Sequence, residues 1–172
     1  MKKFLAVAIL ATGLLGATSA FAQATASTSA SGSVTLIRPL TITKTADLEF
    51  GRIVKHATTT GTVSMTSGAD GVTAGSGAVA LTGITTSRAK FSIDGESGQL
   101  VNVTVPASFG ITNGTDTITV TTASSLGTSV TLSGTYPGAG SSPLNVGGSF
   151  SVLPALSTGV YTGTLNVSVA YN

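Results

Sequence analysis

Apolar residues alternate with Thr and Ser along most of the chain after residue 33, and Gly-rich stretches interrupt this alternation. A period of two predicts β-strands, and no helical period follows residue 22. Because alternation leaves one face of each strand polar, it indicates antiparallel sheets with one solvated face. Strands are predicted over 34–50, 62–66, 78–81, 90–94, 100–105, 116–121, 129–133, 144–152 and 160–171.

The first predicted strand is the longest, and Pro39 interrupts it. Proline lacks a backbone donor, so we expect this strand to bend at Arg38-Pro39. In the strand over 78–81, Val79 and Leu81 are expected to point inward. The apolar face of the first strand is expected to comprise Val34, Leu36, Leu40, Ile42, Ala46, Leu48 and Phe50, with Asp47 and Glu49 on its wet face.

Dipeptides that favour turns separate many of these segments. About nine short strands at this spacing are typical of an Ig-like antiparallel β-sandwich, with a closed barrel as the alternative. The fold class is therefore all-β. The predicted turns contain Asp70-Gly71, Asp94-Gly95, Asn113-Gly114, Pro137-Gly138 and Gly147-Gly148.

The chain begins with Met1-Lys2-Lys3, continues with an apolar run to about Gly16, and reaches Ala20-Phe21-Ala22. This order of a basic, an apolar and a small-residue region predicts a signal peptide over 1–22, cleaved after Ala22. We expect export to the periplasm, the cell surface or the medium. The domain organisation is then a signal peptide (1–22), an N-terminal extension (23–32) and a β-sandwich (33–172).

Removing residues 1–22 leaves six Lys and Arg against six Asp and Glu, so the mature chain is neutral. These charges are scattered, which argues against a nucleic-acid-binding protein. Cysteine is absent, so stability must come from packing, backbone pairing or association between copies. Residues 23–32 alternate small and hydroxyl side chains, which fits either a disordered leader or a strand that pairs outside its own fold.

Candidate catalytic groups are few. The single histidine, His56, has no nucleophile or orienting acid marked near it in the sequence. Asp94-Gly95-Glu96 lacks the full spacing of a calcium loop and is interpreted as a solvated hairpin turn. We therefore expect no enzyme, no cofactor, no metal site and no catalytic residue.

Two segments carry more specific patterns. The first is Leu48-Glu49-Phe50-Gly51. The second runs from Gly159 to Asn172 and contains Gly159-Val160-Tyr161-Thr162-Gly163, with Tyr171 as its penultimate residue. A tyrosine after glycine at the start of a strand is similar to the tyrosine corner of Ig-like sandwiches, and a plain Tyr at a strand start is the alternative.

These motifs, together with Pro39–Lys44, resemble a family of secreted bacterial domains of unknown function, family 4402. The outline also resembles spore-coat-U and archaic chaperone–usher pilin domains. That second resemblance implies an Ig-like sandwich lacking one strand, which a periplasmic chaperone fills first and the N-terminal extension of the next subunit fills afterwards. It also implies other copies or related subunits, a chaperone and an outer-membrane usher as partners.

On this resemblance, the donor face would comprise Ala24, Ala26, Thr28, Ala30, Val34 and Leu36, and the acceptor edge Leu165, Val167, Val169 and Tyr171. Two features depart from the pilin pattern: the chain has no disulfide, and its donor residues are small. The sequence therefore leaves two functions open. One is a fimbrial or cell-surface subunit assembled by strand exchange. The other is a self-complete monomeric binding module, with a functional loop at Gly68–Gly77 or Thr135–Pro143.

Overall fold

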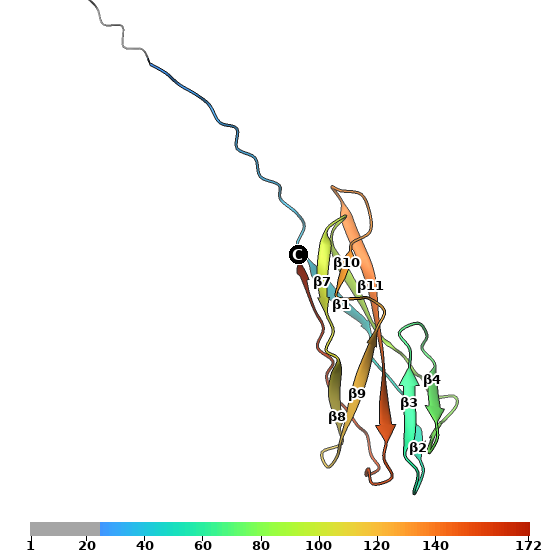
Figure 1. Ribbon diagram of the computed structural model, residues 1–172. Helices are drawn as coiled ribbons and strands as arrows, with labels where there is room; N and C mark the ends of the chain where they lie inside the picture. Colours follow the sequence, from blue (N-terminus) through green and yellow to red (C-terminus); the bar gives the residue numbers. More distant parts are fainter. Residues whose placement is uncertain (1–24) are drawn as a thin grey trace, which may run out of the picture. The chain divides into compact units, whose positions relative to one another are not determined.

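A computed structural model describes residues 25–172. Residues 25–40 form no strand, and the compact β domain starts at Leu36 (Figure 1). All regular elements in the described part of the chain are strands. They are β1 (Thr41–Ala46), β2 (Ile53–Lys55), β3 (Gly61–Met65), β4 (Val72–Gly75), β5 (Ala78–Ala80), β6 (Ala89–Glu96), β7 (Leu100–Thr104), β8 (Ser108–Thr112), β9 (Thr117–Ser124), β10 (Ser129–Thr131), β11 (Ala139–Val152) and β12 (Ser168–Tyr171).

The strands form antiparallel sheets around β11, whose 14 residues make it the longest strand. The first part of β11 pairs with β6 and its last part pairs with β3. Residues Val146–Ser149 also pair with β9, so β9 lies on the opposite side of β11 from β6 and β3. The path β1-β6-β11-β3-β4, with β9 and β8 attached, makes one seven-stranded sheet.

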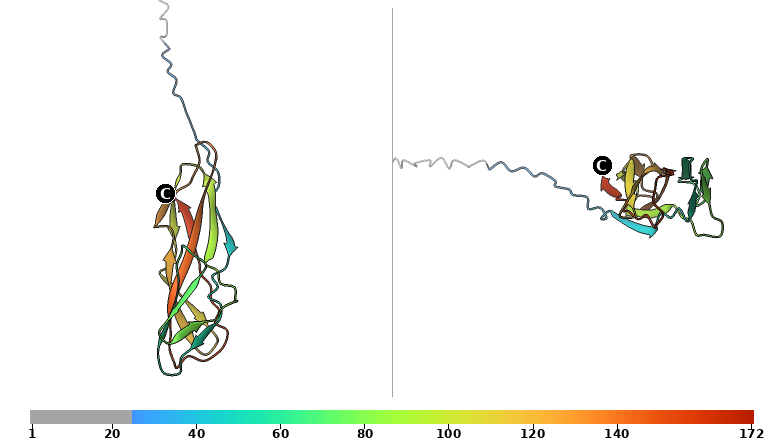
Figure 2. Two further views of the ribbon diagram at one scale, coloured as in Figure 1. Left: turned by 90° about the vertical axis from the view of Figure 1, so that its right-hand side faces the viewer. Right: turned by 90° about the horizontal axis from the view of Figure 1, so that it is seen from below.

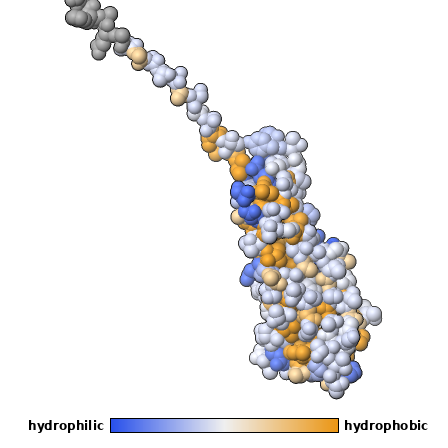
Figure 3. Space-filling view, in the orientation of Figure 1, coloured by the Kyte–Doolittle hydropathy of each residue, from blue (hydrophilic) through white to orange (hydrophobic). Residues whose placement is uncertain are grey.

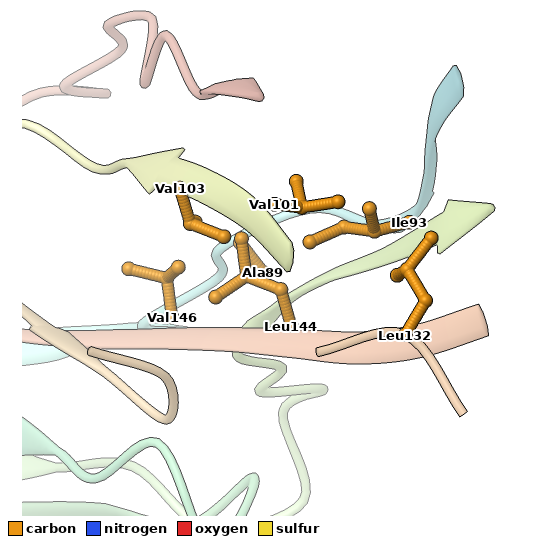
Figure 4. Close-up of a cluster of buried hydrophobic side chains, with 7 residues drawn as sticks. All are labelled: Ala89, Ile93, Val101, Val103, Leu132, Leu144 and Val146. Carbon is orange, nitrogen blue, oxygen red and sulfur yellow. The ribbon is translucent and has the colours of Figure 1, made fainter. Parts of the chain in front are cut away.

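A second sheet has the order β10-β7-β12, and β2 pairs with β5 in a small third sheet. The core lies between the first two sheets, where β6 and β11 face β7 (Figure 4). This arrangement confirms the predicted all-β antiparallel sandwich. Its buried centre is aliphatic and comprises Ala89, Ile93, Val101, Val103, Leu132, Leu144 and Val146.

The predicted alternation holds in most strands. In three of these strands the alternate apolar residues are buried, namely Val63 and Met65 of β3, Val101 and Val103 of β7, and Ile118 and Val120 of β9. Three strands were not predicted, namely β2, β4 and β8, because each is short and is followed or interrupted by glycine or polar residues. Long-range pairing, which a local pattern does not encode, makes strands of them.

The structure corrects two predictions about which way side chains point. The long first strand is wrong in its N-terminal part: β1 begins only at Thr41, and Val34 and Leu36 are 83% and 87% exposed. In β5 the inward residue is Ala78, whereas Val79 is 60% exposed and Leu81 is also exposed. The register of β5 is set by its pairing with β2, and not by the larger side chains.

Two predicted turns, Asp94-Gly95 and Gly147-Gly148, are also wrong, because both lie inside strands. Their glycines permit close approach. A Cβ on Gly95 would collide with the Tyr171 hydroxyl, and one on Gly147 would collide with the Met65 carbonyl oxygen. Glu96, predicted in a solvated turn, is buried. Glycine here makes room for another segment of the chain.

Leu144 packs at the centre of the core with no exposed surface. We predict that Leu144→Ala lowers the free energy of unfolding by about 2–5 kcal/mol, because it removes buried methyl groups and leaves a cavity. Denaturant unfolding followed by circular dichroism measures this loss. The control is Val79→Ala at an exposed position, which should change stability by less than about 0.5 kcal/mol. Equal losses for the two variants would contradict the assigned core.

Candidate functional site

An apolar groove of about 980 Å³ runs along the β domain between two edge segments. The first segment, here called the N-terminal wall, is Lys44–Lys55. The second, the C-terminal wall, is Leu156–Leu165. The groove floor comes from β6, β8, β9 and β11 and comprises Ala89, Phe91, Phe109, Ile111, Ile118, Phe150 and Val152.

Each wall is hydrogen-bonded to the rest of the domain along one side. In the N-terminal wall, β1 pairs with β6, Glu49 bridges to Ser87, and β2 pairs with β5. In the C-terminal wall, Thr162 exchanges two backbone hydrogen bonds with Thr112 of β8, at 2.8 and 3.0 Å. Among the described residues, β1 and β2 each have a single neighbouring strand, and the C-terminal wall is paired only at Thr162. The groove therefore lies between two segments that are each paired with the domain on one side.

Charge is distributed unequally over the two walls. The N-terminal wall alternates inward apolar residues, such as Leu48 and Phe50, with exposed Asp47 and Glu49, as predicted from the sequence. The C-terminal wall has no charged residue, because none follows Asp116 in the sequence. Charges along an edge strand oppose unwanted pairing with other chains. Of the two walls, only the N-terminal wall carries such charges.

Tyr171 joins the two sheets where β1 and β12 approach each other. Its hydroxyl accepts a hydrogen bond from the Glu96 backbone N–H at 2.7 Å and donates one to the Arg38 carbonyl at 3.0 Å. The Glu96 carboxylate in turn accepts from the N–H groups of Arg38 (3.2 Å) and Gly138 (2.7 Å). In the right-hand view of Figure 2, β1 (cyan) and β12 (red) lie on the same side of the domain. The penultimate tyrosine thus closes the sandwich at this end.

Polar contacts also hold the C-terminal wall at the opposite end. The Lys55 ammonium donates to the carbonyls of Pro154 (2.7 Å) and Leu156 (2.6 Å). The Tyr161 hydroxyl donates to the Ser157 carbonyl, four residues upstream, at 2.8 Å. This is the backbone contact expected of a tyrosine corner. It holds Tyr161 against the segment that leads into the wall.

Asp116 anchors the same segment from the turn between β8 and β9. The Ser157 N–H donates to its carboxylate at 2.7 Å, and this hydrogen bond lowers the pKa of the Asp116 carboxyl below its ordinary value. Partial burial, followed by the nearby Asp116 carboxylate, raises the pKa of the Tyr161 phenol. The C-terminal wall is therefore held by a hydrogen bond to the ionised carboxylate of Asp116.

The six residues singled out in the two sequence motifs all line the groove. Leu48, Phe50 and Gly51 belong to the N-terminal wall, where Gly51 adopts a φ of 73°. Gly159, Tyr161 and Gly163 belong to the C-terminal wall, and a Cβ on Gly163 would collide with the Gly110 carbonyl oxygen of β8. The two motifs, more than 100 residues apart in the sequence, are the two sides of one groove.

The predicted acceptor edge is divided. Leu165 lines the groove, whereas Val167, Val169 and Tyr171 are half-buried and pack against the core cluster. The donor candidates Ala26, Thr28, Ala30, Val34 and Leu36 are exposed and lie in no strand, and Ala24 falls outside the described residues. The sequence analysis missed the floor residues of β8, for which the alternation of Phe109 with Ile111 was the available signal.

The described residues show no constellation for catalysis. His56 Nδ1 accepts hydrogen bonds from the N–H groups of Thr58 (3.2 Å) and Thr59 (3.1 Å), so it holds a local turn. Within residues 25–172, no three His, Asp or Glu side chains lie together to hold a metal ion. No helix in that range is long and apolar enough to cross a membrane. The loops at Gly68–Gly77 and Thr135–Pro143 contain β4 and the start of β11.

Fold and site together define an all-β sandwich domain with an apolar groove between two edge segments. The chain belongs to the family described as "Domain of unknown function (DUF4402)", whose sequence model matches residues 40–171. That range includes both walls of the groove and ends at Tyr171. Neither the curated proteins nor the solved structures contain a significant match to the chain.

Removal of the Tyr171 hydroxyl is expected to destabilise the domain. Tyr171→Phe keeps the ring and leaves the Glu96 N–H and the Arg38 carbonyl without this partner. We predict a loss of about 1–3 kcal/mol in the free energy of unfolding, measured in denaturant. The matched control is Tyr136→Phe at a 47% exposed tyrosine. An unchanged midpoint for Tyr171→Phe would contradict the closing role of this hydroxyl.

Acid should loosen the C-terminal wall. Because the folded-state pKa of Asp116 is depressed, its stabilising contact is fully present above the unfolded value, close to 3.8, and is lost as pH falls through the folded value. We predict that amide exchange in residues 156–162 speeds up relative to the core below that pH. In Asp116→Asn this acid-dependent step should disappear. A step of the same size in both proteins would show that another group causes it.

Proposed function

We propose that this protein is a structural subunit of fimbrial or cell-surface type that assembles by β-strand exchange. The N-terminal extension of one copy inserts as a strand into the groove of the next copy. The observation that carries this proposal is the one-sided pairing of both groove walls. An extended segment lying between them can satisfy two rows of backbone groups at once and cover the apolar floor.

The walls and the floor suit a peptide backbone better than a small polar ligand. Hydrogen-bonding edges lie on both sides, and the floor is made of Ala, Phe, Ile and Val side chains. Strand addition takes its affinity from main-chain hydrogen bonds and its specificity from the pockets that receive alternate side chains. Both requirements are present along the length of the groove.

The N-terminal extension has the properties of a donated strand. The extension predicted over 23–32 is followed by three more residues outside the strands, and the described stretch 25–35 is exposed, contains no strand and carries no charge. At about 3.3 Å per residue, the eleven residues 25–35 span about 36 Å when fully extended. The segment is therefore long enough to pair along a wall, and it is uncharged, as is the C-terminal wall.

Donation from one copy to the next is a heterologous contact that does not close on itself, so it produces a filament. Such a subunit needs export, for which residues 1–22, outside the described part of the chain, are the proposed signal peptide. An empty apolar groove favours aggregation, which accounts for the chaperone and usher that the pilin resemblance implies. Catalysis has no part in this function.

We predict that the mature chain, residues 23–172, forms head-to-tail oligomers and that deletion of residues 23–35 leaves a folded monomer. The deletion removes the donor strand and leaves β1 to β12 in place. Size-exclusion chromatography with light scattering gives the mass, and circular dichroism checks the fold. If the intact chain is a stable monomer that is indifferent to the deletion, the domain is a self-complete module and strand exchange is excluded.

Cross-linking can identify the groove as the acceptor, because the chain has no cysteine of its own. Three double variants combine Leu165→Cys with Ala26→Cys, Thr28→Cys or Ala30→Cys. On oxidation, the variant whose donor cysteine lies closest to Leu165 of the next copy should form a ladder of disulfide-linked oligomers. The control combines the same donor cysteines with Ser129→Cys on β10, which does not line the groove. Ladders from the control pair alone would place the contact elsewhere.

A further inference from the structure

The groove is lined by the phenylalanine side chains of this domain. All four phenylalanines among the described residues line it: Phe50 in the N-terminal wall, Phe91 on β6, Phe109 on β8 and Phe150 on β11. Each is only half-buried. Phe50 and Phe150 meet edge to face, with ring centroids 5.0 Å apart and planes at 85°. Four separate segments of the chain thus contribute one phenylalanine each to one surface.

The core of the domain, in contrast, contains no aromatic side chain among its buried residues, which are Ala, Val, Leu, Ile and Met. Phenylalanine offers more apolar surface for burial than these residues do. A fold that leaves its largest apolar side chains half-exposed in a groove gains most when a partner covers them. Aromatic groups are enriched at such contact sites. The aromatic set is therefore placed for binding.

The face of the extension that would point into the groove is small. Positions 26, 28, 30 and 32 are Ala, Thr, Ala and Gly, and the larger Val34 and Leu36 come only at the end nearest the domain. In Figure 3 the described extension is drawn mostly in the pale colours of weakly polar residues, whereas orange hydrophobic patches lie along the domain. The groove therefore has large side chains, and the face of the extension that would enter it has small ones.

We propose, on the basis of the strand-exchange function above, that the four phenylalanines select the donated strand by side-chain size. The groove supplies the bulky groups, and the incoming strand supplies Ala, Thr or Gly at the positions that face them. The groove is therefore specific for the extension of a second copy of this chain. A strand with Leu or Phe at those positions is excluded.

The physical reason is the close approach that backbone pairing demands. The N–H and C=O groups of the inserted strand must come within about 2.9 Å of their partners on the walls. Protein interiors pack at crystal-like density, so each ring that stays in the floor reduces the space left for the side chains of an inserted strand. A larger side chain would hold the backbone away from the walls or force the rings out of their rotamers.

Leucine substitutions on the two faces of the extension test this selection in the full mature chain. Thr28→Leu and Ala30→Leu face the groove, and Ser27→Leu and Ser29→Leu are matched controls on the opposite face. We expect the association constant between copies, measured by analytical ultracentrifugation, to fall about tenfold or more for the first pair, which corresponds to about 1.4 kcal/mol. The controls should stay within about twofold, which is less than about 0.5 kcal/mol.

Compensating substitutions in the floor supply the second test. Phe91→Ala, Phe109→Ala or Phe150→Ala, each combined with Thr28→Leu or Ala30→Leu, should restore association for the pair of residues that face each other. Circular dichroism and thermal unfolding show whether each variant is folded, and Phe109→Leu is the milder version where alanine destabilises the domain. Recovery also identifies the register of the inserted strand.

The outcomes separate this selection from strand exchange itself. If deletion of residues 23–35 abolishes assembly but groove-facing leucines are tolerated or strengthen it, selection by size is wrong and strand exchange stands. Equal weakening by both faces, with no recovery from any floor variant, also overturns it. If the intact chain does not assemble, both proposals fall together.

Discussion

Backbone hydrogen bonding at two facing edges is the constraint on which the rest of this structure depends. Each buried N–H and C=O group needs a partner, and a sheet edge leaves a row of them open. In this domain the N-terminal and C-terminal walls are each paired along one side, with phenylalanine, isoleucine and valine side chains between them. The same gap gives the groove its two walls and its apolar floor, and it is the basis of the proposed strand exchange.

The buried core and the groove occupy different parts of the domain. The aliphatic core between β6, β7 and β11 is closed, and the Tyr171 hydroxyl ties its two sheets together through Glu96 and Arg38. The four phenylalanines of the described residues are only half-buried and line the groove. Because no disulfide is available, packing and backbone pairing must hold the walls in position while the groove stays open. Contacts from Lys55 and Asp116 do this at the end where regular strand structure is absent.

The departures from the expected strands have a common cause. Val34–Leu40 alternates like the strand that follows it, yet it has no pairing partner among the described residues and stays outside the sheets. Residues 160–167 also alternate, and only Thr162 bridges to a neighbour before β12 begins. Alternation describes which face of a segment is apolar. Whether that segment becomes a strand depends on whether another edge lies beside it.

The sequence by itself determined the all-β class, the inward phase of Leu40, Ile42, Leu48 and Phe50, and the two motifs that form the groove walls. These follow from local properties, namely a period of two and the positions of glycine and tyrosine. Only the tertiary structure decided that the two motifs line one groove, that four phenylalanines distant in sequence line it too, and that Gly95 and Gly147 are points of close approach. Such relations depend on which strands pair across long separations, and no single segment of the chain contains that information.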